Sequence, residues 1–441
     1  MTDLPNGWMA ASIEDTGQYI NGLAFKPTDW KDVGTPIIRI KNLTDPEAPI
    51  NRTTRTVPDS VKVTKGTILV SWSATLDAFI WNREDAVLNQ HIFKVVPDER
   101  VVWKSFLYYL LRSEIAVMRD SDHLHGSTMK HINRGPFLAH RIALPPLAEQ
   151  KRIADKLEAV LGRADACRAR LDRVPDLLKR FRQSVLAAAT SGQLTEDWRE
   201  ENRTATWQHL PLGSLASEVK NGLSPKPNEQ PPGTPILRIS SVRPFQVYQN
   251  DIRYLSADIP VDAYRLRIGD LLFTRYNGSL EFVGVCGLVR KIEIEGLVYP
   301  DKLIRVRVDE RRVVPAWIEI AAGSPTVRDV IENTARTSAG QTGISGKDIR
   351  ELVLPVPSLP EQAEIVRRVE ALFALADRIE ARLATAQRLV ERLTPATLSK
   401  AFRGDLVPQD PNDEPASVLL ERLLSDRDRS ISPQRKRTPL R

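Results

Sequence analysis

Cysteine is scarce in this sequence: 441 residues contain only Cys167 and Cys286. Two thiols exclude a disulfide framework and a multi-cysteine zinc site, and they are typical of a reducing compartment. Long apolar runs are also missing, and the first residues, MTDLPNGW, lack the basic-then-apolar pattern of a signal peptide. We therefore expect a cytoplasmic protein with no membrane partner.

Nucleotide-binding and catalytic motifs are missing as well. The sequence has no GxxxxGKS or GxxxxGKT phosphate loop, no GxGxxG that opens a strand-turn-helix unit, and no Asn-Pro-Pro-Tyr-type pocket for a flipped adenine. Acidic residues that a nuclease could use occur at Asp176 and Glu218, but we expect the first in a long helix and the second in a separate domain. These absences argue against a self-sufficient methyltransferase or nuclease, so we expect no catalytic residue and no cofactor bound by this chain.

The chain does have length and positive charge. With 441 residues, the chain is longer than domains that fold around a single hydrophobic core usually are, so we expect at least two domains. Its formal net charge of +7 and its pI near 9.3 favour an anionic partner. A charge excess of this size can also serve solubility alone.

One stretch of the sequence occurs twice. PPLAEQKRIADKLEAVLGRADACRARL begins at Pro145, PSLPEQAEIVRRVEALFALADRIEARL begins at Pro357, and residues 145–195 match residues 357–407 without a gap. Each copy opens with prolines and a Glu-Gln pair and closes at a glycine, Gly192 or Gly404, which is how a helix is started and stopped. The repeat therefore predicts two long, related helices.

Apolar residues in both copies alternate at spacings of four and three for about four heptads, which is the pattern of a coiled-coil seam. A core helix of one large domain usually has a wider apolar face, so we favour the coiled coil. Cys167 lies on this seam, and Cys286 lies in an apolar run, so both are expected to be small buried hydrophobes. Pro175 and Pro395 are expected to interrupt or kink the two helices. The seam positions are Ile153, Leu157, Val160, Ala164, Cys167, Leu171, Val174, Leu178 and Phe181 in the first copy and Ile365, Val369, Leu372, Ala376, Ile379, Leu383, Ala386, Val390 and Leu393 in the second.

The segments ahead of the helices also correspond to each other. Residues 21–23, 34–40 and 66–71 match residues 221–223, 233–239 and 269–274, and short runs of β-branched residues between Gly, Pro and Asn predict mainly β domains. We expect an α+β fold with a pseudo-twofold internal repeat. The predicted domains are residues 1–143 and 196–354, with spacer helices at 144–195 and 355–407 and, at 408–441, a tail with a short helix and a disordered end.

The length of the helices favours antiparallel pairing. A helix of roughly 40 residues is about 60 Å long, whereas a domain of roughly 150 residues is about 40 Å across. The second domain joins the end of the first helix to the start of the second helix. If the helices are antiparallel, these two ends lie close together; if they are parallel, the domain would have to span the full length of the helix pair. The first domain is then expected at the opposite end.

Several motifs together resemble a known family. The LPPLAEQ helix opening, GDLLFTRYNGS, GQTGISGKDI and the tail GDLVPQDPNDEPASVLLERL occur in the order found in the specificity subunit of type I restriction-modification systems. The resemblance covers nearly the whole chain. It implies two target-recognition domains that read the halves of a bipartite double-stranded DNA site, with the coiled coil as the ruler between them.

The resemblance also implies partners and their cofactors. A specificity subunit has no catalysis of its own and docks two methyltransferase subunits, which use S-adenosylmethionine to methylate adenine. Restriction and translocase subunits that hydrolyse ATP with Mg join this complex to cut unmodified DNA. An alternative from another class is a coiled-coil interaction scaffold whose basic domains bind DNA without sequence preference.

Candidate DNA-contacting residues cluster around TRYNGS, which follows a predicted strand. Arg275 suits phosphate or guanine, Tyr276 can pack on a sugar or base, and Asn277 suits adenine. The matching stretch of the first domain, SWSATLDAF, offers a different set, as two domains that read different half-sites require. For any single residue, surface charge is an equally good interpretation. The full set is Arg275, Tyr276, Asn277, Gly278, Ser71, Trp72, Ser73, Thr75, Lys26, Lys226, Lys130, Arg134, Arg336, Thr337, Gln341 and Lys347.

Other polar features have simpler interpretations. His123, His125 and His131 lack the carboxylates or cysteines that would complete a metal site, so a polar DNA-facing loop is favoured and no metal is expected. Arg39 and Arg238 lie inside matched strands and can be partners of structural ion pairs. The basic tail from Arg435 to Arg441 offers at most nonspecific attraction to phosphate.

Overall fold

The computed structural model describes residues 4–119, 132–204, 206–338 and 341–422. The chain forms two compact units. Unit 1 contains Met1–Leu171 with Ala386–Arg441, and unit 2 contains Asp172–Thr385. Each unit combines sheets with helices, so the predicted α+β class is confirmed. None of the helices in the described part of the chain has the length and hydropathy of a membrane-spanning segment.

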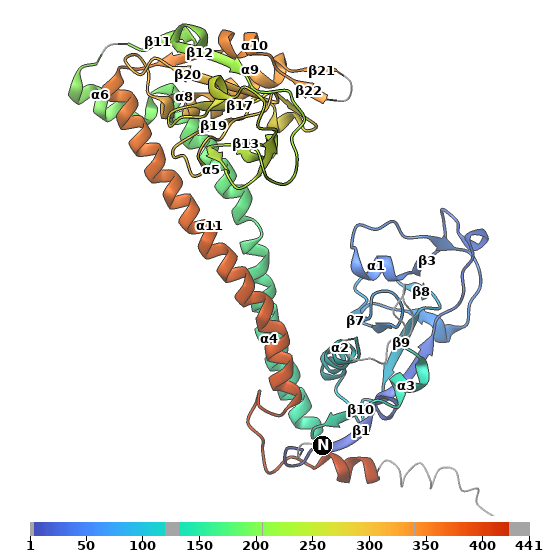
Figure 1. The fold of residues 1–441 in the computed structure, drawn as a ribbon. Coiled ribbons are helices and arrows are strands. Elements are labelled where there is room, and N and C mark those ends of the chain that lie inside the picture. Colours follow the sequence, from blue (N-terminus) through green and yellow to red (C-terminus); the bar gives the residue numbers. More distant parts are fainter. Residues whose placement is uncertain (1–3, 120–131, 205, 339–340, 423–441) are drawn as a thin grey trace, which may run out of the picture. The chain divides into compact units, whose positions relative to one another are not determined.

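The main sheet of unit 1 has four strands in the order β2–β9–β6–β7, and all neighbours are antiparallel. Strands β7 and β9 of this sheet are labelled in Figure 1. A second, mixed sheet has the order β4–β3–β8–β5, and β1 pairs with β10. The bounds are β1 Met9–Ser12, β2 Gly17–Asn21, β3 Thr35–Ile38, α1 Ile40–Thr44, β4 Arg52–Thr53, β5 Lys62–Val63, β6 Ile68–Ser71, β7 Asp77–Ile80, β8 Ala86–Leu88, β9 Ile92–Pro97, α2 Lys104–Arg119, α3 Arg134–Leu138 and β10 Arg141–Leu144.

Unit 2 has the same main sheet, here in the order β12–β20–β17–β19, and β11 pairs with β23 as β1 pairs with β10. Smaller sheets are β13–β16, β14–β15 and β18–β22–β21. The bounds are α6 Glu196–Asn202, β11 Gln208–Pro211, α7 Leu212–Leu215, β12 Ala216–Asn221, β13 Thr234–Leu237, β14 Val242–Arg243, β15 Gln246–Val247, β16 Ile252–Leu255, β17 Leu271–Thr274, β18 Tyr276–Asn277, β19 Cys286–Leu288, β20 Leu303–Val308, α8 Pro315–Gly323, α9 Pro325–Thr334, β21 Arg336–Ser338, β22 Gln341–Gly343, α10 Gly346–Glu351 and β23 Val353–Val356.

The internal repeat thus extends to the order of the strands. We call residues 4–144 the first head and residues 206–356 the second head. Each head ends with the strand that pairs with its first strand, β10 at Leu144 and β23 at Val356. The predicted domain ends, 143 and 354, therefore fall inside these last strands.

Three long helices carry the repeated stretch: α4 (Leu147–Leu171), α5 (Val174–Ser191) and α11 (Leu359–Phe402). Pro175 lies in the first turn of α5, just after the break between α4 and α5, as predicted. Pro395 does not end its helix, because α11 continues through it to Phe402.

The helices pack in an antiparallel sense within each unit. In unit 2, Val185 and Ala189 of α5 share a core with Ile365 and Val369 of α11, and Arg182, earlier in α5, pairs with Asp377, later in α11, at 2.7 Å. In unit 1, residues at the start of α4 share a core with Leu398 and Ala401 at the end of α11. A coiled coil along the full length of the helices stays a prediction.

The seam prediction is wrong at three positions, because Cys167, Ile379 and Leu393 are exposed. Cys167 lies in the last turn or so of α4, and a strict heptad cannot continue through the break between α4 and α5; Leu161 and Leu186, outside the predicted seam, are buried instead. The break does not account for Ile379 and Leu393, which lie in the uninterrupted helix α11. Cys286 is buried as expected. The buried seam positions are Ile153, Leu157, Ala164, Leu178, Ile365, Val369, Ala376 and Leu383. The half-buried ones are Val160, Leu171, Val174, Phe181, Leu372, Ala386 and Val390.

Candidate nucleic-acid interface

One edge of the main sheet in the second head gathers three polar loops. Strand β20 is antiparallel to both β12 and β17, so the ends of β12 and β17 lie beside its start. The loops there are hydrogen-bonded to each other: the N–H of Asp301 donates to the carbonyl of Leu223, and the N–H of Arg275 donates to the carbonyl of Lys302, both at 2.8 Å. A rigid sheet therefore presents the loops that carry Lys226 and the TRYNGS motif at one place.

The TRYNGS and GQTGIS motifs, far apart in the sequence, form one small sheet at this edge. Tyr276 and Asn277 in β18 pair with Gly343 and Thr342 in β22, and β22 pairs in turn with β21. A Cβ on Gly343 would lie 2.2 Å from the Tyr276 ring, so only glycine leaves room for this ring. Cross-strand partners point to the same face, which puts Asn277 and Thr342 side by side. The candidates Arg336, Thr337 and Gln341 are residues of β21 and β22.

Arg275 is held as a stacked cation. Its guanidinium carbon lies 4.7 Å from the centroid of the Tyr276 ring, and one Nη1 hydrogen bond to the carbonyl of Asp301, at 3.4 Å, engages its side chain within the described residues. The buried Nε has no hydrogen-bond partner. A stacked guanidinium with few protein partners can donate to phosphate or to the acceptors of guanine.

Asn277 is partly engaged by its own turn. Its Oδ1 accepts a hydrogen bond from the backbone N–H of Ser279 at 3.0 Å, and Gly278 after it is exposed. Reading adenine uses both the oxygen and the nitrogen of the amide. In this conformation the Nδ2 group of Asn277 can donate to a base. To bind adenine with both amide atoms, Asn277 would have to break the hydrogen bond from the N–H of Ser279.

Two predicted lysines lie at the same edge. Lys226 is exposed in the loop after β12. Lys347 is 79 % exposed in the first turn of α10, and a Cβ on the neighbouring Gly346 would lie 3.7 Å from Oδ1 of Asn221, the last residue of β12. Exposed lysines on one edge fit contacts with phosphates.

The matching edge of the first head carries fewer of its predicted residues in reach of a ligand. Thr75, Lys26 and Arg134 are exposed, and Arg134 begins α3 as Gly346 and Lys347 begin α10. Ser73 is 4 % exposed and Ser71 is fully buried, so the prediction that these side chains face DNA is wrong. Lys130, His123, His125 and His131 lie outside the described residues. Among the residues that the structure does describe, no group of His, Cys, Asp and Glu could hold a metal ion.

Sequence reasoning missed the loops that precede β9 and β20. Lys302 is exposed immediately before β20, and the ring of His91, immediately before β9, lies 5.2 Å from the Trp72 ring. The available signal was the polar residues directly ahead of the β-branched runs that became β9 and β20, Asn-Gln-His at 89–91 and Asp-Lys at 301–302. Arg39 and Arg238 were predicted inside strands, but they directly follow β3 and β13 and begin the next helical turn. Arg238 pairs with Asp251 at 3.2 Å, as an ion-pair partner should, whereas Arg39 lies over the Trp30 ring at 5.1 Å.

The repeated Glu-Gln pair fastens each head to its helix. Buried Gln150 accepts a hydrogen bond from the backbone N–H of Trp103 at 2.8 Å and donates to the carbonyl of Val101 at 3.1 Å. Gln362 accepts from the N–H of Val314 at 2.8 Å and also donates back to its own strand end at Pro357. The pair is repeated because both heads use it to hold the first turn of the helix that follows.

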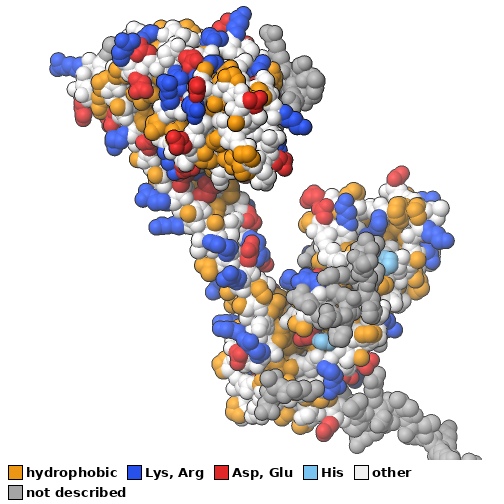
Figure 2. Space-filling model, in the orientation of Figure 1, with side chains coloured by type: hydrophobic (Ala, Val, Ile, Leu, Met, Phe, Trp, Pro, Cys, Tyr) orange, Lys and Arg blue, Asp and Glu red, His pale blue; other side chains and the backbone are white. Residues whose placement is uncertain are grey.

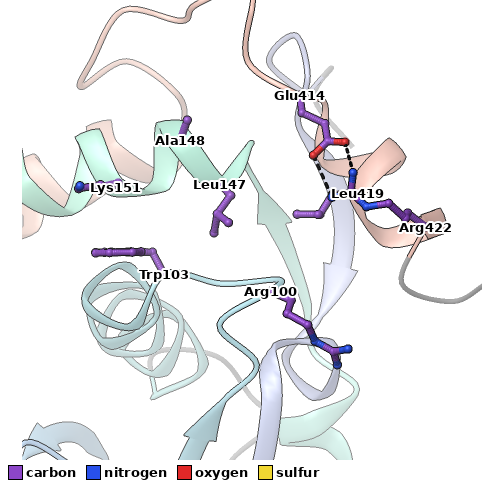
Figure 3. Close-up of a pocket in the computed structure, with 8 residues that line it drawn as sticks. All are labelled: Arg100, Trp103, Leu147, Ala148, Lys151, Glu414, Leu419 and Arg422. Atoms are coloured by element: carbon purple, nitrogen blue, oxygen red, sulfur yellow. Dashed lines mark hydrogen bonds and ion pairs between the residues drawn. The ribbon is translucent and has the colours of Figure 1, made fainter. Parts of the chain in front are cut away.

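The C-terminal segment returns to the start of α4 in unit 1. Arg152 of α4 pairs with Asp413 at 2.6 Å, and the described tail residues 416–422 are helical, as predicted. They border a hollow of about 660 Å³ that the side chains of Trp103, Leu147 and Leu419 line (Figure 3). Lys151 lies 5.3 Å from the Trp103 ring. The segment after α11 therefore helps to hold the first head on α4.

Basic side chains do not form one continuous patch. Figure 2 shows Lys and Arg spread over the visible face of both units and mixed with Asp and Glu. The net charge of +7 therefore does not by itself mark the interface, and the loops at the sheet edges are the better indicator.

The fold and its edges define a duplicated α+β protein whose two heads each present polar loops at the same edge of the same sheet. Comparison with known proteins identifies the family. The family model described as the type I restriction modification DNA specificity domain matches residues 5–173. The EcoKI specificity subunit of Escherichia coli is 39% identical over 96% of both chains, and the StySPI specificity subunit of Salmonella potsdam is 31% identical over 96% of both chains. The chain belongs to the specificity subunits of type I restriction enzymes.

Solved structures agree in fold. A chain from a study of complex assembly and conformational transition of the type I R-M system aligns with a TM-score of 0.66 at 17% identity and covers 92% of this chain and 100% of that one. The HsdS subunit of Thermoanaerobacter tengcongensis aligns with a TM-score of 0.57 at 17% identity, over 92% and 98% of the two chains. At these identities the likeness concerns the fold alone.

Proposed function

We propose that this chain is the DNA-recognition subunit of a type I restriction-modification complex and that each head reads one half of a bipartite site. The observation that carries the proposal is the same polar edge in two related heads, in a chain 39% identical to a specificity subunit over nearly its whole length. The loops on these edges differ between the heads, which suits two different half-sites.

The proposal assigns roles to residues on the two edges. Arg275, Tyr276 and Asn277 contact bases or the adjacent backbone of the second half-site, with phosphate contacts from Lys226 and Lys347. The exposed residues Thr75, Lys26 and Arg134 act in the first head. Two methyltransferase subunits with S-adenosylmethionine, and restriction subunits with ATP and Mg, supply the chemistry, and this chain contributes none.

A binding experiment tests the proposal. The complex with its methyltransferase subunits is expected to protect one bipartite sequence, found by mapping methylated adenines. A change of spacer length by one base pair also rotates the half-sites by about 34°, so binding should weaken by about tenfold or more. Affinity that follows salt alone, with no preferred sequence, would instead support a nonspecific scaffold.

A further inference from the structure

A short hairpin of the second head ends in a residue with an unusual backbone. Phe245 joins β14 to β15 with φ at +64°, in the left-handed region that bulky residues rarely adopt. Its N–H donates to the carbonyl of Cys286 at 3.3 Å, and its carbonyl accepts from Nη1 of Arg290 at 3.4 Å. Arg290 is itself fixed by the buried carboxylate of Glu319. The conformation is therefore held from the main sheet and from α8.

The Phe245 side chain lies where the head meets both helices. Its ring centroid is 5.1 Å from that of Phe373 in α11, with 85° between the ring planes. A Cβ on Gly323, the last residue of α8, would lie 2.7 Å from the tip of the Phe245 ring and 3.8 Å from Leu186 of α5. Glycine at 323 thus makes room for the ring, and Phe245 acts as a wedge between α8, α5 and α11.

The wedge is a second attachment of the head to α11. The first is at the start of the helix, where Gln362 holds the backbone of Val314 and Glu361 accepts a hydrogen bond from Trp207. Residues 362 and 373 are about 16 Å apart along the helix. Ile365 and Val369 pack in the core of the head between these two points, so the wedge extends the contact of the head along α11 to Phe373 and restricts its tilt on the helix.

Open space lies beside the wedge. A cleft of about 1010 Å³ is lined by Phe245, Phe373 and Tyr248, among others, and Tyr248 is 46% exposed. The head has room to tilt into this cleft once the Phe245 ring is removed. The Phe245 ring packs at the edge of the core that α5, α8 and α11 share, and it is the part of this contact that borders open space.

We propose that Phe245 is a positioning residue that sets the tilt of the second head on its helices and so restricts the spacer length of the DNA site. This inference rests on the proposed reading of a bipartite site. With a head about 40 Å across, a tilt of about 5° moves its far edge by about 3.5 Å, close to the 3.4 Å rise of one base pair. A small change in tilt is therefore equivalent to a change of one base pair in spacer.

The test uses the whole complex with its methyltransferase subunits and duplexes that carry its own methylation target with the spacer changed by one or two base pairs. Phe245→Ala is expected to reduce the penalty for a one-base-pair change from about tenfold to threefold or less, while mismatches within either half-site keep their cost. Phe245→Leu should restore most of the wild-type profile, because leucine keeps an apolar contact with Phe373. Tyr248→Ala, in the same hairpin region, should leave it unchanged.

A second variant probes displacement instead of removal. Gly323→Ala pushes the ring from its place and should shift the preferred spacer or broaden the profile. If Phe245→Ala keeps the wild-type profile, or weakens binding to all spacers equally, the inference is wrong. If the wild-type complex shows no spacer preference at all, the proposed function fails first, which distinguishes the two.

Discussion

Trp207 donates its indole N–H to the buried carboxylate of Glu361 at 3.0 Å, so the first strand region of the second head is tied to the first turn of α11. The same carboxylate accepts from Thr195 at 2.9 Å and from Arg199 at 3.0 Å. In unit 1 the equivalent Glu149 accepts from Trp8 at 3.0 Å, but its buried Oε1 has no hydrogen-bond partner among the residues that the structure describes. We call each buried glutamate with its hydrogen-bond donors an anchor. The two anchors share the tryptophan donor, but in the described part of the chain only the Glu361 anchor also has a threonine and an arginine donor.

Replacing Glu361 tests the complete anchor. Glu361→Gln removes the negative charge that pairs with Arg199. It also replaces one of the two carboxylate oxygens, which accept hydrogen bonds, with an NH2 group, which donates them. We expect unit 2 to lose about 2 kcal/mol of unfolding free energy and its Tm to fall by about 4–8 °C, measured by scanning calorimetry. Glu370→Gln, an exposed position on the same helix, is the control. Equal Tm values for the two variants would contradict the role of this anchor.

Completing the Glu149 anchor should stabilise unit 1. Gly192 and Gly404 end their helices at φ +84° and +83°, and the third residue after each is Thr195 or Val407. Val407→Thr should therefore supply the hydroxyl that Glu149 lacks. In a double-mutant cycle with Glu149→Gln we expect a favourable coupling of about 1 kcal/mol. A coupling of zero would show that residue 407 does not reach Glu149.

The pH dependence of unit 1 should reflect Glu149. Burial raises the pKa of its carboxyl group above the usual value of 4.5. The folded state then binds the proton more tightly than the unfolded state, so the stability contribution is present below pH 4.5 and is lost as pH rises through the folded pKa. Glu149→Gln should gain stability relative to wild type as the pH rises from 4 to 8 in thermal unfolding scans. A constant difference for Glu149→Gln would count against this assignment.

Asn277 should affect one half-site only. Asn277→Ala is expected to relax discrimination at one base pair of the second half-site by about 1–3 kcal/mol, because its amide is on the small sheet at the head's edge. Thr75→Ala in the first head is the reciprocal control, with any effect confined to the first half-site. Competition binding with single-base variants of the target measures both. Unchanged preference in the second half-site would remove Asn277 from the base-reading residues.

Lys226 should act on phosphate without regard to sequence. Lys226→Ala is expected to weaken all duplexes by a similar factor and to reduce the slope of log affinity against log salt by about 1. Lys291→Ala, whose lysine is 74% exposed and paired with Glu293, should leave the slope unchanged. Titrations at several salt concentrations measure the slope. A sequence-dependent loss for Lys226→Ala would assign it to base contact instead.

Much of the fold could be predicted because repetition and periodicity are local signals. The matches at 34–40 and 233–239 became β3 and β13, and the glycines at 192 and 404 mark the ends of the helices. The errors arose where tertiary packing decides. Cys167 fits the heptad but is exposed near a helix break, and Ser73 stands in a polar loop but is buried.

The sequence by itself determined that the protein is duplicated, that long helices follow each head, and that the polar TRYNGS motif lies at the end of a strand, because these properties depend on residue order alone. Only the tertiary structure decided that TRYNGS and GQTGIS share one sheet, that Glu-Gln fastens each head to its helix, and that Phe245 wedges against Phe373. Contacts between residues far apart in the chain follow from strand pairing and packing, and neither leaves a periodic pattern in the sequence.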